Sequence, residues 1–223
     1  MSHPPHETSD FLGRLGQSIR DEQPGYAAVR VPKHGHVYHI GDSAETVYFI
    51  ESGQVKLLML SPEGKECLLG IHVAGDVFGE SCLQGASRRH EMATAMENTA
   101  LRCIPSAVLF EHLGRHAMVE GFVRHLVTRI ADQQQIIAHL MTVDSEHRLG
   151  QTLLALARKL GKQDPRNNRI GQKITHEELS QMVGTTRPRV TKFMLKFRLL
   201  GLITVSPEHF LIVDEKKLAA FLT

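Results

Sequence analysis

The sequence is poor in cysteine and has no long apolar run. Its three cysteines, Cys67, Cys82 and Cys103, form no Cys-x-x-Cys pair and are odd in number, which argues against a disulfide framework and a four-thiolate cluster. We interpret all three as small, buried apolar side chains. No segment has the pattern of a signal peptide or a membrane span, so we expect a cytoplasmic protein with no membrane partner.

The sequence also lacks the signatures of catalysis. It contains no nucleophile elbow, no P-loop and no paired-carboxylate motif. His34 and His36 resemble the start of a cupin metal motif, but the next acids, Asp42 and Glu45, miss the required spacing. We therefore predict no catalytic residue and no enzyme activity, with a cupin-like metalloenzyme as the remote alternative.

Histidine, in contrast, is abundant, with 14 residues in the chain. His34, His36 and His39 cluster in the sequence, and His112 and His116 lie four residues apart on a predicted helix. Imidazole is a common metal ligand, but this clustering has little specificity. We interpret these histidines as surface side chains and predict no metal site.

A pair of short helices is predicted from residue 174 to residue 193. Thr175 and Glu178 have the spacing of a capping box, which begins the first helix. Gly184 supplies a turn after that helix. The apolar residues of the first helix keep helical spacing, and they are Leu179, Met182 and Val183.

The second helix is expected to start at Thr186, whose side chain can cap it. Pro188 falls in its first turn, where a missing N–H has no consequence. The small Ser180, the turn glycine and the apolar Val190 have the spacing of two crossed helices. The segment is therefore predicted to be a helix-turn-helix whose second helix directs Val190, Phe193 and Met194 towards the core.

Cationic and hydroxyl side chains are left on the outer face of this helix pair. We interpret Arg187, Arg189 and Lys192 as ligands of guanine edges or phosphates, and Thr191 as a ligand of a thymine methyl group or a phosphate. The full predicted DNA-binding set is Thr175, Thr186, Arg187, Arg189, Thr191, Lys192 and Lys196. Residues 202–213 then show two apolar runs around a turn at 206–209, which predicts a hairpin and hence a winged helix.

Charge is divided unevenly along the chain. Residues 145–223 carry 14 Lys and Arg against 7 Asp and Glu, whereas residues 1–144 carry 12 against 17. A basic C-terminal part beside an acidic N-terminal part is typical of a phosphate-binding domain joined to a separate sensing domain. Residues 1–10 have no apolar stretch, and we expect them to form a disordered lead.

Short predicted strands fill much of the N-terminal part, at residues 47–50, 55–60 and 66–71. Glycine turns punctuate them at 41–42, 52–53, 62–64 and 75–76, which predicts an antiparallel barrel or roll. Residues 41–55 and 75–80 closely resemble the cyclic-nucleotide-binding β-roll. With the C-terminal module, nearly the whole chain resembles the CRP/FNR family of bacterial transcription regulators.

The predicted fold class is α+β. An N-terminal antiparallel β-roll, of the double-stranded β-helix or jelly-roll type, is followed by a long dimerisation helix and a C-terminal winged helix-turn-helix domain. We expect a lead and N-terminal helix over residues 1–27, the roll over 28–116, the long helix over 117–142 and the DNA-binding domain over 143–223.

The long helix is expected to have two apolar faces. Val119, Phe122 and Leu126 form one stripe that can face the roll. The other stripe has heptad spacing, and the resemblance implies that it forms the seam of a homodimer. The predicted seam residues are Val123, Val127, Ile130, Gln134, Ile137 and Met141.

The resemblance also implies an effector site in the roll. Gly79 and Glu80 match the pair that contacts the ribose in the cyclic-AMP binders of the family, and Arg89 or Arg88 matches the phosphate ligand. The expected effector-binding set is Gly79, Glu80, Ser81, Arg89, His90, Gln133 and Gln134. The effector is not assigned, and cyclic AMP and cyclic GMP are the candidates.

Because His90 stands where family members carry the phosphate-binding hydroxyl, other interpretations stay open. Glu80 and Arg89 can pair with each other, or the protein can be an effector-independent, redox-sensing or metal-sensing regulator of the same family. A two-fold dimer would place recognition helices in successive major grooves, so the expected partner is an inverted repeat in double-stranded DNA. Many members carry Glu where this chain has Pro188, so the half-site is expected to differ from theirs. The resemblance also implies RNA polymerase as a partner.

Overall fold

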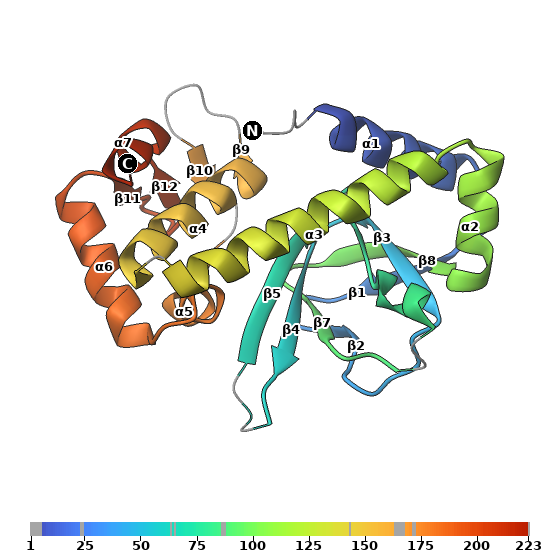
Figure 1. The fold of residues 1–223 in the computed structure, drawn as a ribbon, viewed down its shortest axis with the longest axis horizontal. Coiled ribbons are helices and arrows are strands. Elements are labelled where there is room, and N and C mark those ends of the chain that lie inside the picture. Colours follow the sequence, from blue (N-terminus) through green and yellow to red (C-terminus); the bar gives the residue numbers. More distant parts are fainter. Residues whose placement is uncertain are drawn as a thin grey trace. The chain divides into compact units, whose positions relative to one another are not determined.

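The computed structural model describes residues 6–22, 25–62, 64, 66–85, 88–142, 144–162, 168–170 and 173–222. The chain divides into two compact units, Met1–Asp132 and Gln133–Thr223. The division falls within one helix, α3 (Val119–Thr142), which is yellow-green in Figure 1. The predicted α+β fold, with a roll, a long helix and a winged helix-turn-helix, is confirmed.

Two four-stranded antiparallel sheets form the β-roll of the first unit. Their strand orders are β1-β8-β3-β6 and β2-β7-β4-β5. The strands are β1 (Ala27–Val31), β2 (His36–Tyr38), β3 (Thr46–Ser52), β4 (Gln54–Leu60), β5 (Glu66–Val73), β6 (Val77–Phe78), β7 (Met92–Ala95) and β8 (Thr99–Pro105). The three strands predicted from the sequence lie within β3, β4 and β5 and are confirmed.

Strand β3 separates two apolar clusters because its side chains alternate between the faces of the sheet. Val47 and Phe49 belong to a cluster that the sheet shares with the helices of the first unit. Ile50 lies in the other cluster, inside the roll, where Tyr48 packs against it as a partly buried side chain. This alternation therefore decides which side chains of β3 line the interior of the roll.

Three helices cover the outer face of the first sheet: α1 (His6–Asp21), α2 (Ser106–Arg115) and the first part of α3. A short 3-10 helix, η1 (Glu80–Gln84), follows β6. Phe11, Leu15 and Ile19 lie four residues apart on α1 and are all buried. The prediction of a disordered lead is wrong from His6 onward, because the helix that carries these apolar residues begins one turn before Phe11; residues 1–5 lie outside the described part.

The roll-facing stripe predicted for α3 is confirmed at two positions and wrong at the third. Phe122 is 1% exposed and Leu126 packs against the same cluster. Val119, at the first position of the helix, is 43% exposed. Met118, which comes directly before the helix, is buried in the cluster and takes the place expected for Val119.

The second unit contains four helices besides the end of α3, counted over its described residues. They are α4 (Ser145–Leu160), α5 (His176–Val183), α6 (Arg187–Leu199) and α7 (Glu215–Phe221). A small sheet of order β11-β12-β10-β9 accompanies them, formed by β9 (Gly161–Lys162), β10 (Asn168–Ile170), β11 (Ile203–Val205) and β12 (Leu211–Val213). The predicted hairpin is β11 and β12 and is confirmed, whereas β9, β10 and α7 were not predicted.

Two predictions about single residue types need correction. Cys82 is buried and Cys103 half-buried, but Cys67 is exposed because it lies in β5 opposite Met59, which is itself exposed. The interpretation of His112 as a surface residue is wrong, since its side chain is fully buried on the core-facing side of α2. Among the described residues, no helix combines the length and the apolar character needed to cross a bilayer.

Candidate nucleic-acid interface and effector site

The helix pair α5 and α6 begins with the predicted capping box. The Thr175 hydroxyl accepts a hydrogen bond from the N–H of Glu178 at 3.1 Å, and the Glu178 carboxylate accepts one from the N–H of Thr175 at 2.9 Å. Two N–H groups that a helix start leaves without partners are thereby satisfied. Thr175 is exposed, but its hydroxyl already takes part in the cap.

The turn between the helices also has the predicted form. Gly184 adopts a φ of 66°, which is the left-handed conformation that a helix C-terminus needs and that glycine adopts without strain. Ser180 is 4% exposed and Val190 is fully buried, so the helices meet through a small side chain and an apolar one. The relation between α5 and α6 is therefore fixed by local residue choice.

The start of α6 differs from the prediction in one respect. Thr186 is the N-cap residue and has an extended backbone, but its side chain makes no capping hydrogen bond. An N-cap side chain accepts from the second or third N–H of a helix. The second residue here is Pro188, which has no N–H, so one of the two usual donors is missing.

The outer face of α6 carries exposed cations. Arg187, Arg189 and Lys192 are all exposed, and within the described part of the chain neither Arg189 nor Lys192 has an ion-pair partner. The opposite face holds the helix in the core through Val190, Met194 and Phe197, with Phe193 half-buried. Apolar burial thus orients the helix and leaves its cations accessible.

Thr191 lies on the same face, and its hydroxyl has protein partners. It donates to the carbonyl oxygen of Arg187 at 3.0 Å and lies 2.9 Å from Nδ1 of His176. Since the hydroxyl proton goes to the carbonyl, His176 is the donor in the second contact. Burial, and after it the charge of Arg187, lowers the pKa of His176. His176 was not predicted, although its place directly after the capping threonine sets it beside α6.

Lys196 occupies a different environment from the other predicted DNA ligands. Its Nζ lies 2.6 Å from a carboxylate oxygen of Glu146 in α4 and 5.4 Å from the centre of the Phe221 ring in α7. The side chain therefore connects α6 to its own unit. Lys196 lies one turn after Lys192 on α6, but its charge is paired with Glu146.

In the first unit, Arg89 is directed into the roll and is 1% exposed. Its guanidinium donates to the carbonyl oxygens of Gly79, at 2.7 Å, and of Thr46. It lies over the Tyr38 ring, 4.3 Å from the ring centre, and 5.7 Å from the centre of the Tyr48 ring. Burial raises the pKa of both tyrosines, so they face the guanidinium as neutral phenols.

Arg88 and His90, the neighbours of Arg89, are both exposed. Arg88 donates to the carbonyl oxygen of Gly41 at 2.7 Å. The phosphate-binding candidate inside the roll is therefore Arg89 and not Arg88. The expectation that His90 acts beside Arg89 is not met, because the His90 side chain is exposed whereas that of Arg89 is buried.

Glu80 pairs with Arg129 of α3 rather than with Arg89. The interpretation in which Glu80 and Arg89 form an ion pair is therefore wrong for the described structure. Arg129 was not predicted, yet it follows Phe122 and Leu126 at helical spacing and so lies on the face of α3 that meets the roll. That spacing could have identified it from the sequence.

Ser81, another predicted effector ligand, has a protein partner as well. Its hydroxyl donates to Glu91 at 3.2 Å, and the Tyr38 hydroxyl donates to the same oxygen at 2.9 Å. Glu91 is 8% exposed and was not predicted. Gln133 and Gln134 are exposed and belong to the second unit.

The predicted seam of α3 is exposed in the single chain. Val123, Val127 and Ile130 are 52%, 59% and 53% exposed in the first unit, and Ile137 is 61% exposed in the second. Gln134 is exposed too, and the side chain of Met141 lies outside the described part. A row of half-exposed branched aliphatic side chains on one helix is typical of an interface.

Comparisons with known proteins match both units. A family model described as the cyclic nucleotide-binding domain matches residues 28–116, and one described as the Crp-like helix-turn-helix domain matches residues 147–221. The CRP-like cAMP-activated global transcriptional regulator of Mycobacterium tuberculosis is 31% identical over 192 residues, covering 86% of each protein.

Solved structures give the same result for the fold. A CRP-family transcriptional regulator from Thermus thermophilus is 28% identical, with a TM-score of 0.70 over 86% of this chain and 95% of that one. A CRP/FNR-family regulator from the same organism is 24% identical, with a TM-score of 0.70 over 88% and 98%. The second likeness concerns the fold alone.

Proposed function

Because the chain belongs to the CRP/FNR family of transcription regulators, we propose that it acts as a homodimer on an inverted repeat in double-stranded DNA. The family is one of DNA-binding regulators and not of enzymes. The observation that carries the proposal is the exposed cationic face of α6, held in place by buried Val190, Met194 and Phe197. We also infer from the family that the bound dimer contacts RNA polymerase.

The proposed roles of the α6 residues follow from their exposure. Arg189 and Lys192 are accessible cations, and Arg187 lies at the helix start, so these three contact guanine edges or phosphates. The side chain of Pro188 cannot accept a hydrogen bond from cytosine, so the half-site differs from that of members with Glu at this position. Lys196, which pairs with Glu146, supports the helix and contributes less to DNA contact.

Thr175, Thr186 and Thr191 form the hydroxyl part of the proposed interface. Thr175 and Thr191 are exposed, but each hydroxyl already makes a hydrogen bond within the protein. The Thr186 hydroxyl makes no capping hydrogen bond. Thr186 is therefore the hydroxyl best suited to donate to a backbone phosphate at the start of α6.

Dimerisation is proposed through the exposed seam of α3. A two-fold dimer places its two recognition helices about 34 Å apart, in successive major grooves. The half-sites should then be related by two-fold symmetry with centres about one helical turn apart. The exposed Val123, Val127, Ile130 and Ile137 support the proposal.

Selection of bound sequences from a random duplex library tests DNA binding and symmetry together. The parent chain should enrich an inverted repeat, and Arg189→Ala should lose preference at one position of each half-site. Lys216→Ala is the matched control, because Lys216 is an exposed cation on α7 and not on α6. Recovery of unrelated sequences by the parent, or the same loss in both variants, would contradict the proposal.

We further propose that Arg89 binds the phosphate of a small anionic effector in the roll, with cyclic AMP and cyclic GMP as the candidates. A buried guanidinium is the group best suited to a buried phosphate. Its Nε has no hydrogen-bond partner among the described residues, which supports a missing ligand. Gly79 and Glu80 then take the ribose positions that the family implies.

A second candidate, an effector-independent regulator, is favoured by a different observation. Arg89 already donates to two backbone carbonyl groups, and Glu80 already pairs with Arg129. An effector has to displace these contacts before it can bind. In an effector-independent regulator, the same contacts hold Arg89 and Glu80 within the protein.

Titration calorimetry with each cyclic nucleotide separates the two candidates. Effector control predicts binding heat with the parent, loss of heat with Arg89→Gln, and retention with Arg88→Gln, whose side chain is exposed. A thermal melt of each variant verifies that it is folded. Absence of heat at millimolar nucleotide would leave the effector-independent regulator as the surviving candidate.

A further inference from the structure

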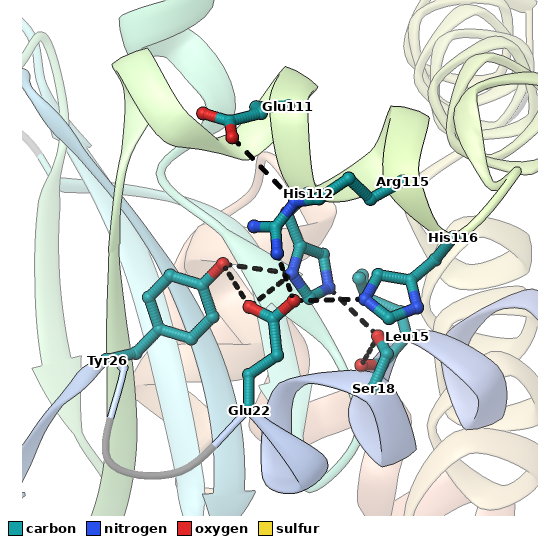
Figure 2. A network of polar contacts seen from close by, with 8 residues as sticks. All are labelled: Leu15, Ser18, Glu22, Tyr26, Glu111, His112, Arg115 and His116. Carbon is teal, nitrogen blue, oxygen red and sulfur yellow. Dashed lines mark hydrogen bonds and ion pairs between the residues drawn. The ribbon is translucent and has the colours of Figure 1, made fainter.

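Glu22, His112 and His116 meet in the first unit, where the end of α1 lies beside α2. One ligand atom from each of them lies within 4.8 Å of the others, and they are the only group of this kind found in the described part of the chain. Figure 2 shows the Glu22 carboxylate among the side chains of Tyr26, His112 and His116. Two imidazoles and a carboxylate are a ligand set that Zn²⁺ takes in proteins.

The two nitrogen–oxygen distances are close to those between the ligands of a tetrahedral ion. Nδ1 of His112 lies 3.1 Å from Oε2 of Glu22, and Nε2 of His116 lies 3.1 Å from Oε1. Each oxygen of the carboxylate therefore faces one ring nitrogen. A tetrahedral Zn²⁺ with bonds of about 2.0 Å separates its ligand atoms by about 3.3 Å, which is close to both nitrogen–oxygen distances. The ligand atoms of the three residues all lie within 4.8 Å of one another, so the two rings have to draw together around an ion.

Ser18 determines which nitrogen of His112 is available. The Ser18 hydroxyl donates to the carbonyl oxygen of Leu15 at 2.9 Å and lies 2.9 Å from Nε2 of His112. Because its only proton goes to the carbonyl, the hydroxyl accepts the N–H of Nε2. Nδ1 then carries a lone pair, and the groups that face it are the Tyr26 hydroxyl at 2.9 Å and the Glu22 carboxylate at 3.1 Å. A bare nitrogen beside a carboxylate lacks a donor from that carboxylate, so it is suited to a cation, and an outer hydrogen bond on the other nitrogen is the usual way in which a metal-binding histidine is prepared.

The surroundings leave one side of the cluster open. His112 is fully buried, whereas Glu22 and His116 are 22% and 33% exposed. The hydrogen bond with His116 is the main cause that lowers the pKa of Glu22 to about 2, so the carboxylate is charged at neutral pH. Burial raises the pKa of Tyr26 to about 12, so this residue contributes a neutral hydroxyl.

We propose that Glu22, His112 and His116 bind a first-row divalent cation, represented by Zn²⁺, through Nδ1 of His112, Nε2 of His116 and the Glu22 carboxylate. Water completes the coordination on the open side. The ion takes the place of the contact between Nε2 of His116 and Oε1 of Glu22. Since His116 follows α2 as its C-cap residue and α3 begins three residues later, the ion joins the end of α1 to the segment that leads into α3.

Arg115 competes with the ion for the same carboxylate. Its guanidinium lies 2.8 Å from Oε1 of Glu22 and its side chain is 52% exposed. It can therefore move into solvent, but its charge opposes cation binding. Removing it should tighten metal binding, whereas in a purely structural ion-pair network its removal would bring no such gain.

Titration calorimetry of the full chain with Zn²⁺, in the presence of a competing chelator, tests the site. We expect one tight equivalent in the parent, a loss of at least about 100-fold in affinity for His116→Ala and Glu22→Gln, and about 10-fold to 100-fold for Ser18→Ala. Arg115→Ala should bind several-fold more tightly, because a like charge has been removed.

His36→Ala is the matched control, since His36 and His39 are another pair of neighbouring rings, 4.3 Å apart, outside the cluster. It should bind like the parent. Co²⁺ as a second probe should give the visible absorption of a four-coordinate ion in the parent and not in His116→Ala. The proposal is overturned if the parent binds no tight equivalent, if His116→Ala binds as well as the parent, or if Arg115→Ala binds more weakly.

Discussion

Replacement of Ile130 by alanine should weaken the dimer without harming the helix that carries it. Ile130 is 53% exposed on α3 and occupies the predicted seam. Alanine has the highest helix propensity, so α3 should keep its structure. Any weakening of the dimer then reports on the apolar contact and not on local unfolding.

The size of the effect follows from the exposed fraction. Burying a complete Ile side chain contributes about 1.5–3 kcal/mol. About half of Ile130 is still exposed in the single chain, so its burial in a dimer contributes about 1 kcal/mol, or about 2 kcal/mol for both copies. The dissociation constant of the dimer should rise about 30-fold.

Sedimentation equilibrium over a range of protein concentrations measures this constant directly. Ile136→Ala is the matched control, because Ile136 is 49% exposed on the same helix but lies off the predicted heptad positions. It should dimerise like the parent. An unchanged constant for Ile130→Ala, or an equal weakening for Ile136→Ala, would refute the seam.

Further predictions concern the second unit. Lys192→Ala should lower the slope of log affinity against log salt by about 0.9 for each phosphate that the variant no longer neutralises, as measured by fluorescence anisotropy with a duplex. Phe197→Ala, at a fully buried site, should lower the free energy of unfolding by about 3–5 kcal/mol in urea melts. Asp144→Ala should lower it by about 1 kcal/mol, because the Asp144 carboxylate accepts from the N–H groups of Glu146 and His147. The hydrogen bond from the His147 N–H is the main cause that lowers the pKa of Asp144. The contribution of the Asp144 carboxylate to the free energy of unfolding is therefore fully present above its unfolded pKa of about 3.9, and it is lost as the pH falls through the lowered folded pKa. Parent and Asp144→Ala should therefore become equally stable in acid, and a difference that persists there would contradict this cause.

The helix-turn-helix could be predicted because its determinants act over short distances. A capping box joins residues three apart, a left-handed turn needs one glycine, and a proline in the first turn affects only its nearest neighbours. The fold therefore uses Thr175, Gly184 and Pro188 in the roles that the sequence predicts for them. The Thr186 side chain makes no capping hydrogen bond, and the reason is equally local. Pro188 has no N–H to donate, which the sequence already shows.

The strands and the roll were likewise recognisable, but the partners of single side chains were not. Glu80 meets Arg129, and Lys196 meets Glu146, across elements that are distant in the sequence. Helical spacing tells which face a residue occupies and not which residue will lie opposite. The predicted effector-binding and DNA-binding roles therefore differ most from the structure at Glu80 and Lys196, whose charges pair with other side chains of the protein.

The amino-acid order alone determined the sequence of elements, the apolar faces and the cationic helix, because each depends on periodicity or on neighbours within one turn. Only the tertiary structure decided that His112 is buried and that its ring nitrogen faces Glu22, which is 90 residues away in the chain. Contacts of that range depend on how packed helices and sheets bring distant segments together, and on burial that no local pattern encodes. The candidate metal site is a product of that packing.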